Sequence, residues 1–167
     1  MSLVAQAVTF AAQRHHGQMR KDRITPYVAH PFRVLFILRD LFDVKDPETL
    51  AAGVLHDTIE DTTTDHDDLL RHFGPRVAGF VTLLTKDKRM REEERERAYF
   101  EGLRTAPVEV KLCKLADSLD NVMDRDALAP EGREKALKKA RLLIQTFEPG
   151  FPKEWTHALE RLKTAVK

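Results

Sequence analysis

The amino-acid sequence predicts a single all-α domain, a bundle of about eight or nine helices, and three observations lead to this prediction. Apolar residues recur three and four positions apart in one segment after another, which is the spacing of a helix face. Prolines and glycines separate these segments, where helices begin and end. No segment alternates apolar and polar residues as a strand would. The 167 residues, 42% of them apolar, are enough for one shared core.

The first two expected helices flank a basic loop. The segment LVAQAVTFAAQ gives one apolar stripe, and Gly17 is its expected C-cap. The loop GQMRKDRITPY follows, and His30 then precedes Pro31. A residue before proline avoids the helical conformation, whereas proline suits the first helical turn. We therefore expect His30 at the start of a helix that runs to about Leu41.

Three further helical segments are expected in the middle of the chain. The dipeptide DP at residues 46–47 is a start signal for a helix through residues 48–61. Thr64 and Asp67 resemble a capping box before the apolar run DLLRHF. The dipeptide GP ends that run and opens RVAGFVTLL. One helical segment should therefore end at this glycine and another should begin after it.

The last part of the chain continues the helical pattern. Residues 91–104 form a charged helix, and Pro107 begins another with the apolar stripe of VEVKLCKLADSLDNV. Residues 131–147 form the next helix, EPGFP interrupts it, and the last helix contains WTHALERL. We expect these C-terminal helices to complete one domain that spans residues 1–167.

The composition excludes several classes of protein. The 28 basic and 27 acidic residues leave a net charge of +1, whereas a general nucleic-acid-binding protein would show a strongly basic face. Cys113 is the only cysteine, so no internal disulfide forms and nothing indicates an oxidising compartment. No apolar run approaches the roughly 18 residues of a membrane span. A cytoplasmic protein without a membrane partner is the expectation.

The segment LAAGVLHDTIED places four ionisable side chains at the end of an apolar helix. His56 and Glu60 lie four residues apart, as do Asp57 and Asp61, so each pair shares a helix face. Gly53, one turn before His56, would leave the surface beside the imidazole open. Burying these charges is costly without a partner, and a divalent cation would stabilise them.

Two more candidate ligands come from other helices. His30 stands at the start of one, and Asp117 lies off the apolar stripe of another, on the face of Cys113 and Asn121. Two histidines with two aspartates suit manganese or iron better than a closed structural zinc site. Each residue alone also has an ordinary explanation. A His-Asp pair can be hydrogen-bonded core, and an isolated aspartate can be a satisfied buried carboxylate.

Basic residues would have to offset the acidic cluster if the ligand is an anion. Arg20 and Lys21 precede His30, and Lys86 follows a later apolar run. A solvated surface is the alternative for each of these cations. Tyr27 could stack on a base or pack the loop.

Five motifs occur in one order: HHGQMRK, TPYVAHPFRV, LAAGVLHDTIEDT, FGPRVAGFVTLLTK and KLADSLDN. In these motifs the sequence resembles the HD-domain metal-dependent phosphohydrolases, and within them the alarmone hydrolases of the RelA/SpoT homologues. The resemblance covers residues 5 to about 125. It implies one divalent ion, usually manganese, with four protein ligands: His30, His56, Asp57 and Asp117. Glu60 and Asp61 would be the catalytic acidic pair beside the attacking water. Arg20, Lys21 and Asn121 would contact the nucleotide.

The reaction implied is removal of the 3′-pyrophosphate of guanosine tetra- or pentaphosphate, which leaves GDP or GTP. Some relatives act on adenosine analogues or on NADPH, and a non-catalytic nucleotide-binding regulator is a third possibility. Ser118 follows KLAD where the family commonly has arginine, which puts one substrate contact in doubt. The length leaves no room for a synthetase domain, so a hydrolase-only form is expected. Homo-oligomerisation is left open.

Overall fold

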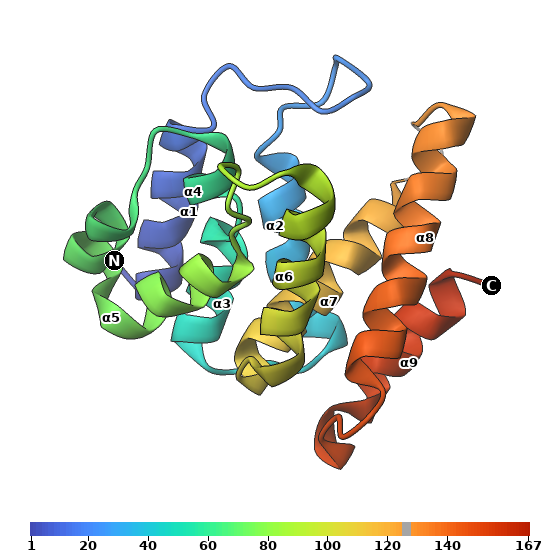
Figure 1. The fold of residues 1–167 in the computed structure, drawn as a ribbon. Helices are drawn as coiled ribbons and strands as arrows, with labels where there is room; N and C mark the ends of the chain where they lie inside the picture. Colours follow the sequence, from blue (N-terminus) through green and yellow to red (C-terminus); the bar gives the residue numbers. More distant parts are fainter. Residues whose placement is uncertain (125–127) are drawn as a thin grey trace.

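The computed structural model describes residues 1–124 and 128–167, and in these ranges the prediction of an all-α fold is confirmed (Figure 1). The α-helices are α1 (Leu3–Arg14), α2 (Ala29–Phe36), α3 (Pro47–Leu55), α4 (Thr58–Asp61), α5 (His66–Leu84), α6 (Glu92–Thr105), α7 (Val108–Met123), α8 (Pro130–Phe147) and α9 (Thr156–Ala165). A π-helical turn, Ile37–Leu41, continues α2, and a 3₁₀ turn, Lys153–Trp155, precedes α9. None of the helices in the described ranges combines the length and apolar character needed to cross a membrane.

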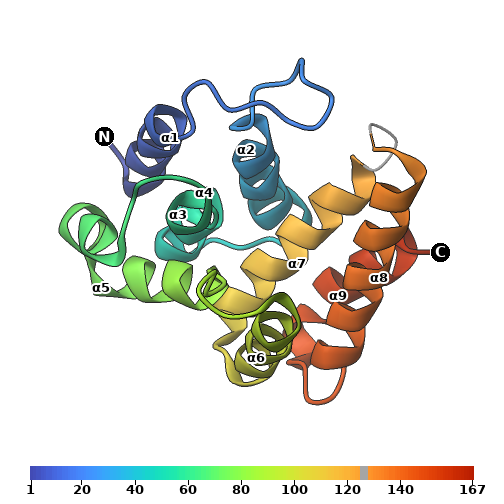
Figure 2. The ribbon, with the colours of Figure 1, turned by 45° about the horizontal axis from the view of Figure 1, so that its top comes forward.

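Helix α7 lies in the middle of the molecule and connects two groups of helices (Figure 2). On one side it packs on α2, α3 and α5, and α1 covers α3. On the other side α8 and α9 pack against it. Its apolar stripe is buried as the sequence pattern predicts, and both groups bury their apolar faces on this helix. Side chains of α7 can therefore reach functional groups from both halves.

His30 lies at the start of a helix, as the sequence predicts. His30 is the second residue of α2 and is buried. The helical path continues to Leu41, but its last turn is π-helical. Helix α1 ends at Arg14, and Gly17 lies beyond it in a turn with a φ of 77°. The C-cap of α1 is therefore His15 and not Gly17. Gly17 adopts the left-handed conformation in the turn that follows the helix.

The single helix predicted through residues 48–61 is wrong. Helix α3 ends at Leu55 and α4 begins at Thr58, with His56 and Asp57 between them. The His56 ring Nδ1 bonds the Gly53 carbonyl at 2.8 Å, and the Thr58 hydroxyl donates to the Leu55 carbonyl at 2.7 Å. Side chains thus satisfy two carbonyls at the end of α3, which offers the backbone an alternative to a continuing helix.

The N-cap of helix α5 lies one residue later than predicted. The capping box is formed by Asp65 and Asp68, which exchange bonds of 2.8 and 3.3 Å, and not by Thr64 and Asp67. The predicted boundary at Gly74 is a kink within α5, where this glycine has a φ of 81° and a ψ of 173°. The proline after it begins the second half of α5.

Gly53 does not leave an open surface beside His56. A Cβ atom built on Gly53 would lie 2.3 Å from Leu38 Cδ1 and 3.6 Å from Val34 Cγ1. Both neighbours are fully buried. The glycine therefore lets α3 approach the segment of α2 and its π-helical turn closely, which brings His56 towards His30.

Gly53→Ala should destabilise the protein by about 1 kcal/mol, because overpacking a buried contact costs more than the helix propensity gained. Gly79→Ala in α5 is the matched control. Its Cβ would meet nothing within 4 Å, so it should be neutral or stabilising. Urea unfolding of both variants measures the difference. Equal stability of the two variants would contradict a close approach at Gly53.

Candidate metal centre and active site

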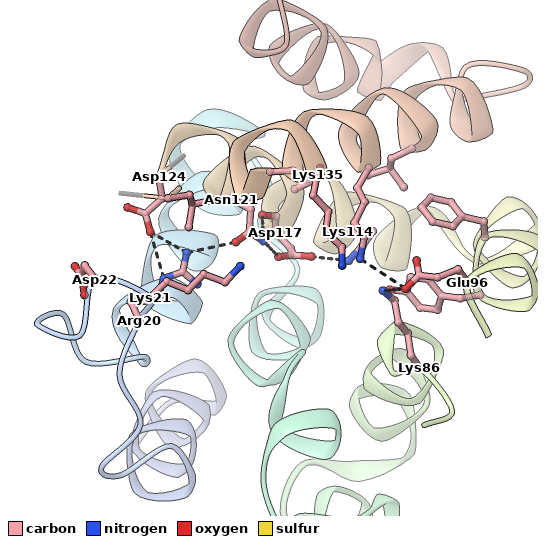
Figure 3. A pocket seen from close by; sticks show the side chains of 18 residues that line it. Arg20, Lys21, Asp22, Lys86, Glu96, Lys114, Asp117, Asn121, Asp124 and Lys135 are labelled. Atoms are coloured by element: carbon pink, nitrogen blue, oxygen red, sulfur yellow. Dashed lines mark hydrogen bonds and ion pairs between the residues drawn. The ribbon is translucent and has the colours of Figure 1, made fainter. Parts of the chain in front are cut away.

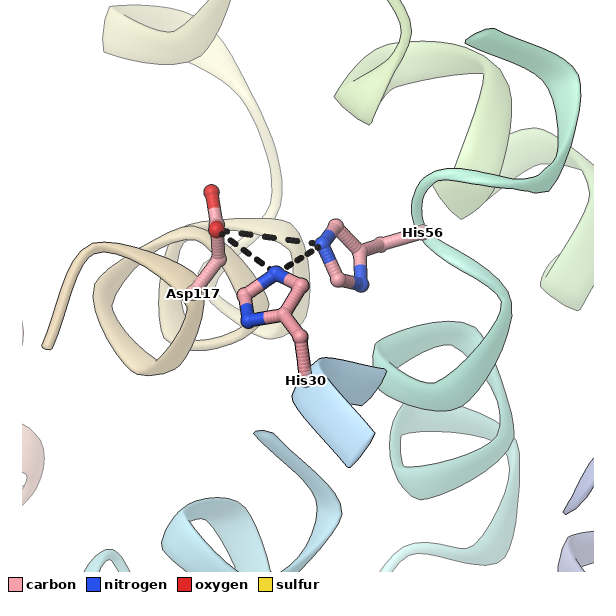
Figure 4. Close-up of side chains that lie close together, drawn as sticks. All are labelled: His30, His56 and Asp117. Atoms are coloured by element: carbon pink, nitrogen blue, oxygen red, sulfur yellow. Dashed lines mark hydrogen bonds and ion pairs between the residues drawn. The ribbon is translucent and has the colours of Figure 1, made fainter. Parts of the chain in front are cut away.

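Two imidazoles face each other in the interior (Figure 4). His30 Nδ1 lies 2.6 Å from Asp120 Oδ2, and His56 Nδ1 lies 2.8 Å from the Gly53 carbonyl oxygen. Each Nδ1 therefore donates its hydrogen to an oxygen, and each Nε2 is left facing the other imidazole. The two Nε2 atoms are 3.2 Å apart. With both Nδ1 hydrogens committed, the lone pairs of the two Nε2 atoms would repel each other, so the pair calls for a shared proton or a cation between the rings.

Asp117 of α7 brings a carboxylate to the same point. Its Oδ1 lies 3.2 Å from His30 Nε2 and 3.8 Å from His56 Nε2. Asn121 donates to this oxygen at 2.6 Å, and the half-buried Lys114 ammonium donates to the other oxygen at 2.6 Å. One donor atom from each of these three predicted ligands lies within 4.8 Å of the other two. The structure thus gathers three of the four predicted ligands into one group that could hold a metal ion.

Asp57 borders this group. Its Oδ2 lies 3.0 Å from His56 Nε2 and 3.7 Å from His30 Nε2. The Tyr27 hydroxyl donates a short hydrogen bond to the same oxygen. Tyr27 also packs its ring against His15 and His30, with centroids 4.9 and 5.9 Å apart. The tyrosine therefore positions a carboxylate, and its ring packs against the imidazoles of His15 and His30.

The charges of the group match a bound cation. Although burial lowers it, the carboxylates of Asp117 and Asp120 raise the pKa of His30 to about 9. Against burial, which raises it, the Lys114 ammonium and the two histidines hold the pKa of Asp117 well below its usual range. A divalent cation would supply the positive charge that protons supply here. Two imidazole nitrogens with carboxylate oxygens suit a transition-metal ion, so the residues present fit the group.

The predicted acidic pair lies beside these ligands on α4. Glu60 Oε2 accepts a hydrogen bond of 3.2 Å from the Lys86 backbone N–H. Asp61 pairs with the Lys88 ammonium at 3.0 Å and accepts a weak bond from Tyr27 at 3.4 Å. Both carboxylates and the four predicted ligands line one cavity of about 160 Å³. The rest of its lining is Arg20, Tyr27, Leu84, Lys86, Tyr99, Lys114 and Asn121.

Figure 3 shows the side chains that line a larger cavity of about 350 Å³. This cavity adjoins the first and shares part of its wall. The shared residues are Arg20, Lys86, Tyr99, Lys114, Asp117 and Asn121. Lys21 lines only the larger cavity, together with Ser118 and with Lys135 and Lys139 of α8. The structure therefore places every predicted site residue on one of two adjoining cavities. Six basic and four acidic side chains line the larger one.

Two of the predicted anion-binding side chains already have acidic partners. Arg20 Nη2 lies 2.8 Å from Asp124 Oδ2 and 3.3 Å from Asn121 Oδ1. Lys86 Nζ lies 2.7 Å from Glu96 and 5.1 Å from the centre of the Tyr99 ring. Both side chains are held at the cavity wall.

Sequence reasoning missed three contributions to this region. Asp120, which holds His30, lies one turn from Asp117, and that helical spacing was the signal that could have revealed it. Lys135 and Lys139 lie in a segment without a recognised motif. Their spacing of four residues puts both on one face of α8, but no local signal says which face meets the cavity.

A family comparison agrees with this geometry. The profile described as "HD domain" matches residues 7–148. The chain belongs to the HD-domain family. The guanosine-3′,5′-bis(diphosphate) 3′-pyrophosphohydrolase MESH1 of Xenopus tropicalis is 40% identical to this HD-domain protein over 132 residues, which is 78% of the chain and 74% of the relative. The human MESH1 protein is 41% identical over 128 residues, 76% of the chain and 72% of the relative.

A solved structure is similar over almost the whole chain. It is described as a metazoan ortholog of SpoT that hydrolyses ppGpp and plays a role in starvation responses. Its TM-score to this HD-domain protein is 0.87 at 30% sequence identity, and the alignment covers 99% of the chain and 94% of the other. The likeness therefore includes α8 and α9, where the sequence shows no recognised motif.

Proposed function

We propose that this HD-domain protein is a metal-dependent guanosine-3′,5′-bis(diphosphate) 3′-pyrophosphohydrolase. It would release pyrophosphate from guanosine tetra- or pentaphosphate and leave GDP or GTP. The observation that supports this most is the joining of a cavity that holds two histidines and four carboxylates to a larger one lined by more basic than acidic side chains. The first suits a cation and the second suits phosphate groups. The names of the MESH1 relatives and the ppGpp hydrolysis described for the structural neighbour support the choice of substrate.

Four residues would hold one Mn²⁺ ion in this proposal: His30, His56, Asp57 and Asp117. His30, His56 and Asp117 form the group described above. Asp57 is proposed because its carboxylate lies beside both imidazoles. The mixture of nitrogen and oxygen donors supports manganese. When bound, a divalent cation lowers the pKa of a coordinated water and polarises a phosphoryl oxygen.

Glu60 is the proposed general base that takes the proton of the attacking water, with Asp61 second. The Lys86 N–H fixes one Glu60 oxygen, and the carboxylate lines the cavity of the ligands. Asp61 instead pairs with Lys88 and is 38% exposed. A positioned carboxylate in the cavity can accept a proton during the reaction, so the structure favours the order Glu60 before Asp61.

The substrate's phosphates would be repelled by the acidic cavity and attracted by the larger one. Lys21, Lys135 and Lys139 line the larger cavity, and Arg20 and Lys86 line both. These cations support binding of a polyanion whose 3′ end reaches the metal centre. A cytoplasmic location is part of the proposal, because a lone cysteine gives no sign of an oxidising compartment.

A second candidate substrate is an adenosine alarmone or NADPH. It is favoured by Ser118, which lines the larger cavity at the position where the family commonly has arginine. A hydroxyl in place of a guanidinium changes the hydrogen-bond donors offered to a base.

Comparison of substrates tests the proposal. The manganese-loaded protein should show its highest kcat/KM on guanosine tetraphosphate, above the adenosine analogue and NADPH. EDTA should abolish turnover, and Mn²⁺ should restore it. A higher kcat/KM on NADPH, with release of orthophosphate, would favour the second candidate. No turnover on any nucleotide would indicate a binding regulator instead.

A further inference from the structure

Two carboxylates of α7 contact opposite sides of one imidazole. Asp117 Oδ1 lies 3.2 Å from His30 Nε2, and Asp120 Oδ2 lies 2.6 Å from His30 Nδ1. The Asp120 side chain is 3% exposed, and the His30 side chain is 1% exposed. Asp120 lies outside the set of ligands proposed above, yet it makes the shorter contact. It therefore determines which ring nitrogen of His30 carries the hydrogen.

Arg33 holds the same carboxylate from the other side. Its Nε lies 2.5 Å from Asp120 Oδ1, and its Nη2 lies 2.9 Å from Asp120 Oδ2. This is a two-point guanidinium–carboxylate contact, which fixes the plane of the carboxylate as well as its place. Arg33 is three residues after His30 on α2, so one helix face presents both side chains to Asp120.

Arg33 is itself restrained. Its Nη2 also lies 3.0 Å from Asp124 Oδ2, and that oxygen accepts from Arg20 Nη2 at 2.8 Å. A series of ion pairs therefore runs from the cavity wall at Arg20 to the imidazole of His30. The order is Arg20, Asp124, Arg33, Asp120, His30.

We infer that Arg33 and Asp120 are positioning residues that orient His30 Nε2 towards a divalent cation. The inference rests on the metal site proposed above. Metal-bound histidines commonly donate their second ring N–H to a carboxylate, and loss of that partner weakens metal binding. Here the carboxylate is itself fixed by Arg33. Helices α2 and α7 pack on each other, and each also buries apolar residues in the shared core, so the pair is not needed simply to join them.

Mn²⁺ affinity of the metal-free protein tests the inference without an activity assay. Free Mn²⁺ is measured by electron paramagnetic resonance in titrations of wild type, Arg33→Met and Asp120→Ala. Both variants should raise the Kd by about 10–100-fold. Asp120→Asn should raise it less than Asp120→Ala, because the amide oxygen still accepts from His30 Nδ1. Arg33 is 37% exposed, so its variant should fold even if Asp120→Ala does not.

Arg39→Met is the matched control. Arg39 also makes a two-point contact with an aspartate, Asp40, at 2.7 and 3.0 Å on the same helical segment, but away from the cavity. Its Kd should equal that of wild type. In Arg33→Met, turnover lost at limiting Mn²⁺ should return at saturating Mn²⁺, with an unchanged KM for the nucleotide. A general structural defect would not be repaired in this way.

Two outcomes would overturn the inference, and they differ in what they imply for the proposed metal site. If wild type binds Mn²⁺ and Arg33→Met binds it with the same Kd, the positioning role is wrong and the proposed metal site stands. If wild type binds no divalent cation, the proposed site fails, and the positioning role fails with it.

Discussion

His56→Ala is expected to abolish metal binding and hydrolysis together. The ring lies between α3 and α4, its Nδ1 is committed to the Gly53 carbonyl, and its Nε2 faces His30 and Asp57. Removal leaves one imidazole and the carboxylates, and outer partners of ligands alone change affinity by about 10–100-fold. Loss of a ligand should therefore raise the Kd for Mn²⁺, measured by titration, by more than about 100-fold. No turnover should be detectable.

His66→Ala is the control for this variant. His66 is exposed at the start of α5, and its Nδ1 contacts the Thr82 hydroxyl at 2.9 Å, outside both cavities. It should bind Mn²⁺ and turn over as wild type does. Normal activity of His56→Ala would remove the basis for a histidine-containing metal centre.

Glu60→Gln is expected to retain the metal and lose turnover. The amide still accepts from the Lys86 N–H, so the local structure should persist, but it cannot take a proton. Loss of a general base typically lowers the rate by about 10²–10⁴-fold. Measurement of kcat at saturating Mn²⁺, together with the Mn²⁺ content of the purified protein, separates the two effects.

Two further variants place the Glu60 result in context. Asp61→Asn should lower kcat less, because Asp61 is partly exposed and pairs with Lys88. Glu101→Gln, on the exposed face of α6, should leave kcat unchanged. If Glu60→Gln turns over at a near-normal rate, the assignment of the acidic pair is wrong.

Much of the helical architecture was predictable because it depends on local signals. Apolar periodicity and proline or glycine boundaries located most helices, including the boundary at Gly74, which the structure shows as a kink within α5. The break at His56 was not predictable in this way, because side-chain bonds to the Gly53 and Leu55 carbonyls decide it. The role of Gly53 depends on how closely α2 approaches, which is a property of tertiary packing.

The site shows the same division between local motif and tertiary packing. The motifs predicted residues that the fold does bring to two adjoining cavities, although their chemical roles remain predictions. Asp120 and Arg33 went unrecognised because each looks like an ordinary helical charge until α2 and α7 are packed together. Lys135 and Lys139 could be assigned to the larger cavity only once the position of α8 was known. From sequence alone, a basic helix is usually interpreted as solvent-exposed.

Product identification by phosphorus NMR tests the central claim most directly. The manganese-loaded protein is incubated with guanosine tetraphosphate, and the released species are followed without separation. The proposed function predicts pyrophosphate and GDP in equal amounts, with no orthophosphate and no reaction after removal of the metal. Orthophosphate as the product, or an unchanged substrate with Mn²⁺ demonstrably bound, would contradict it.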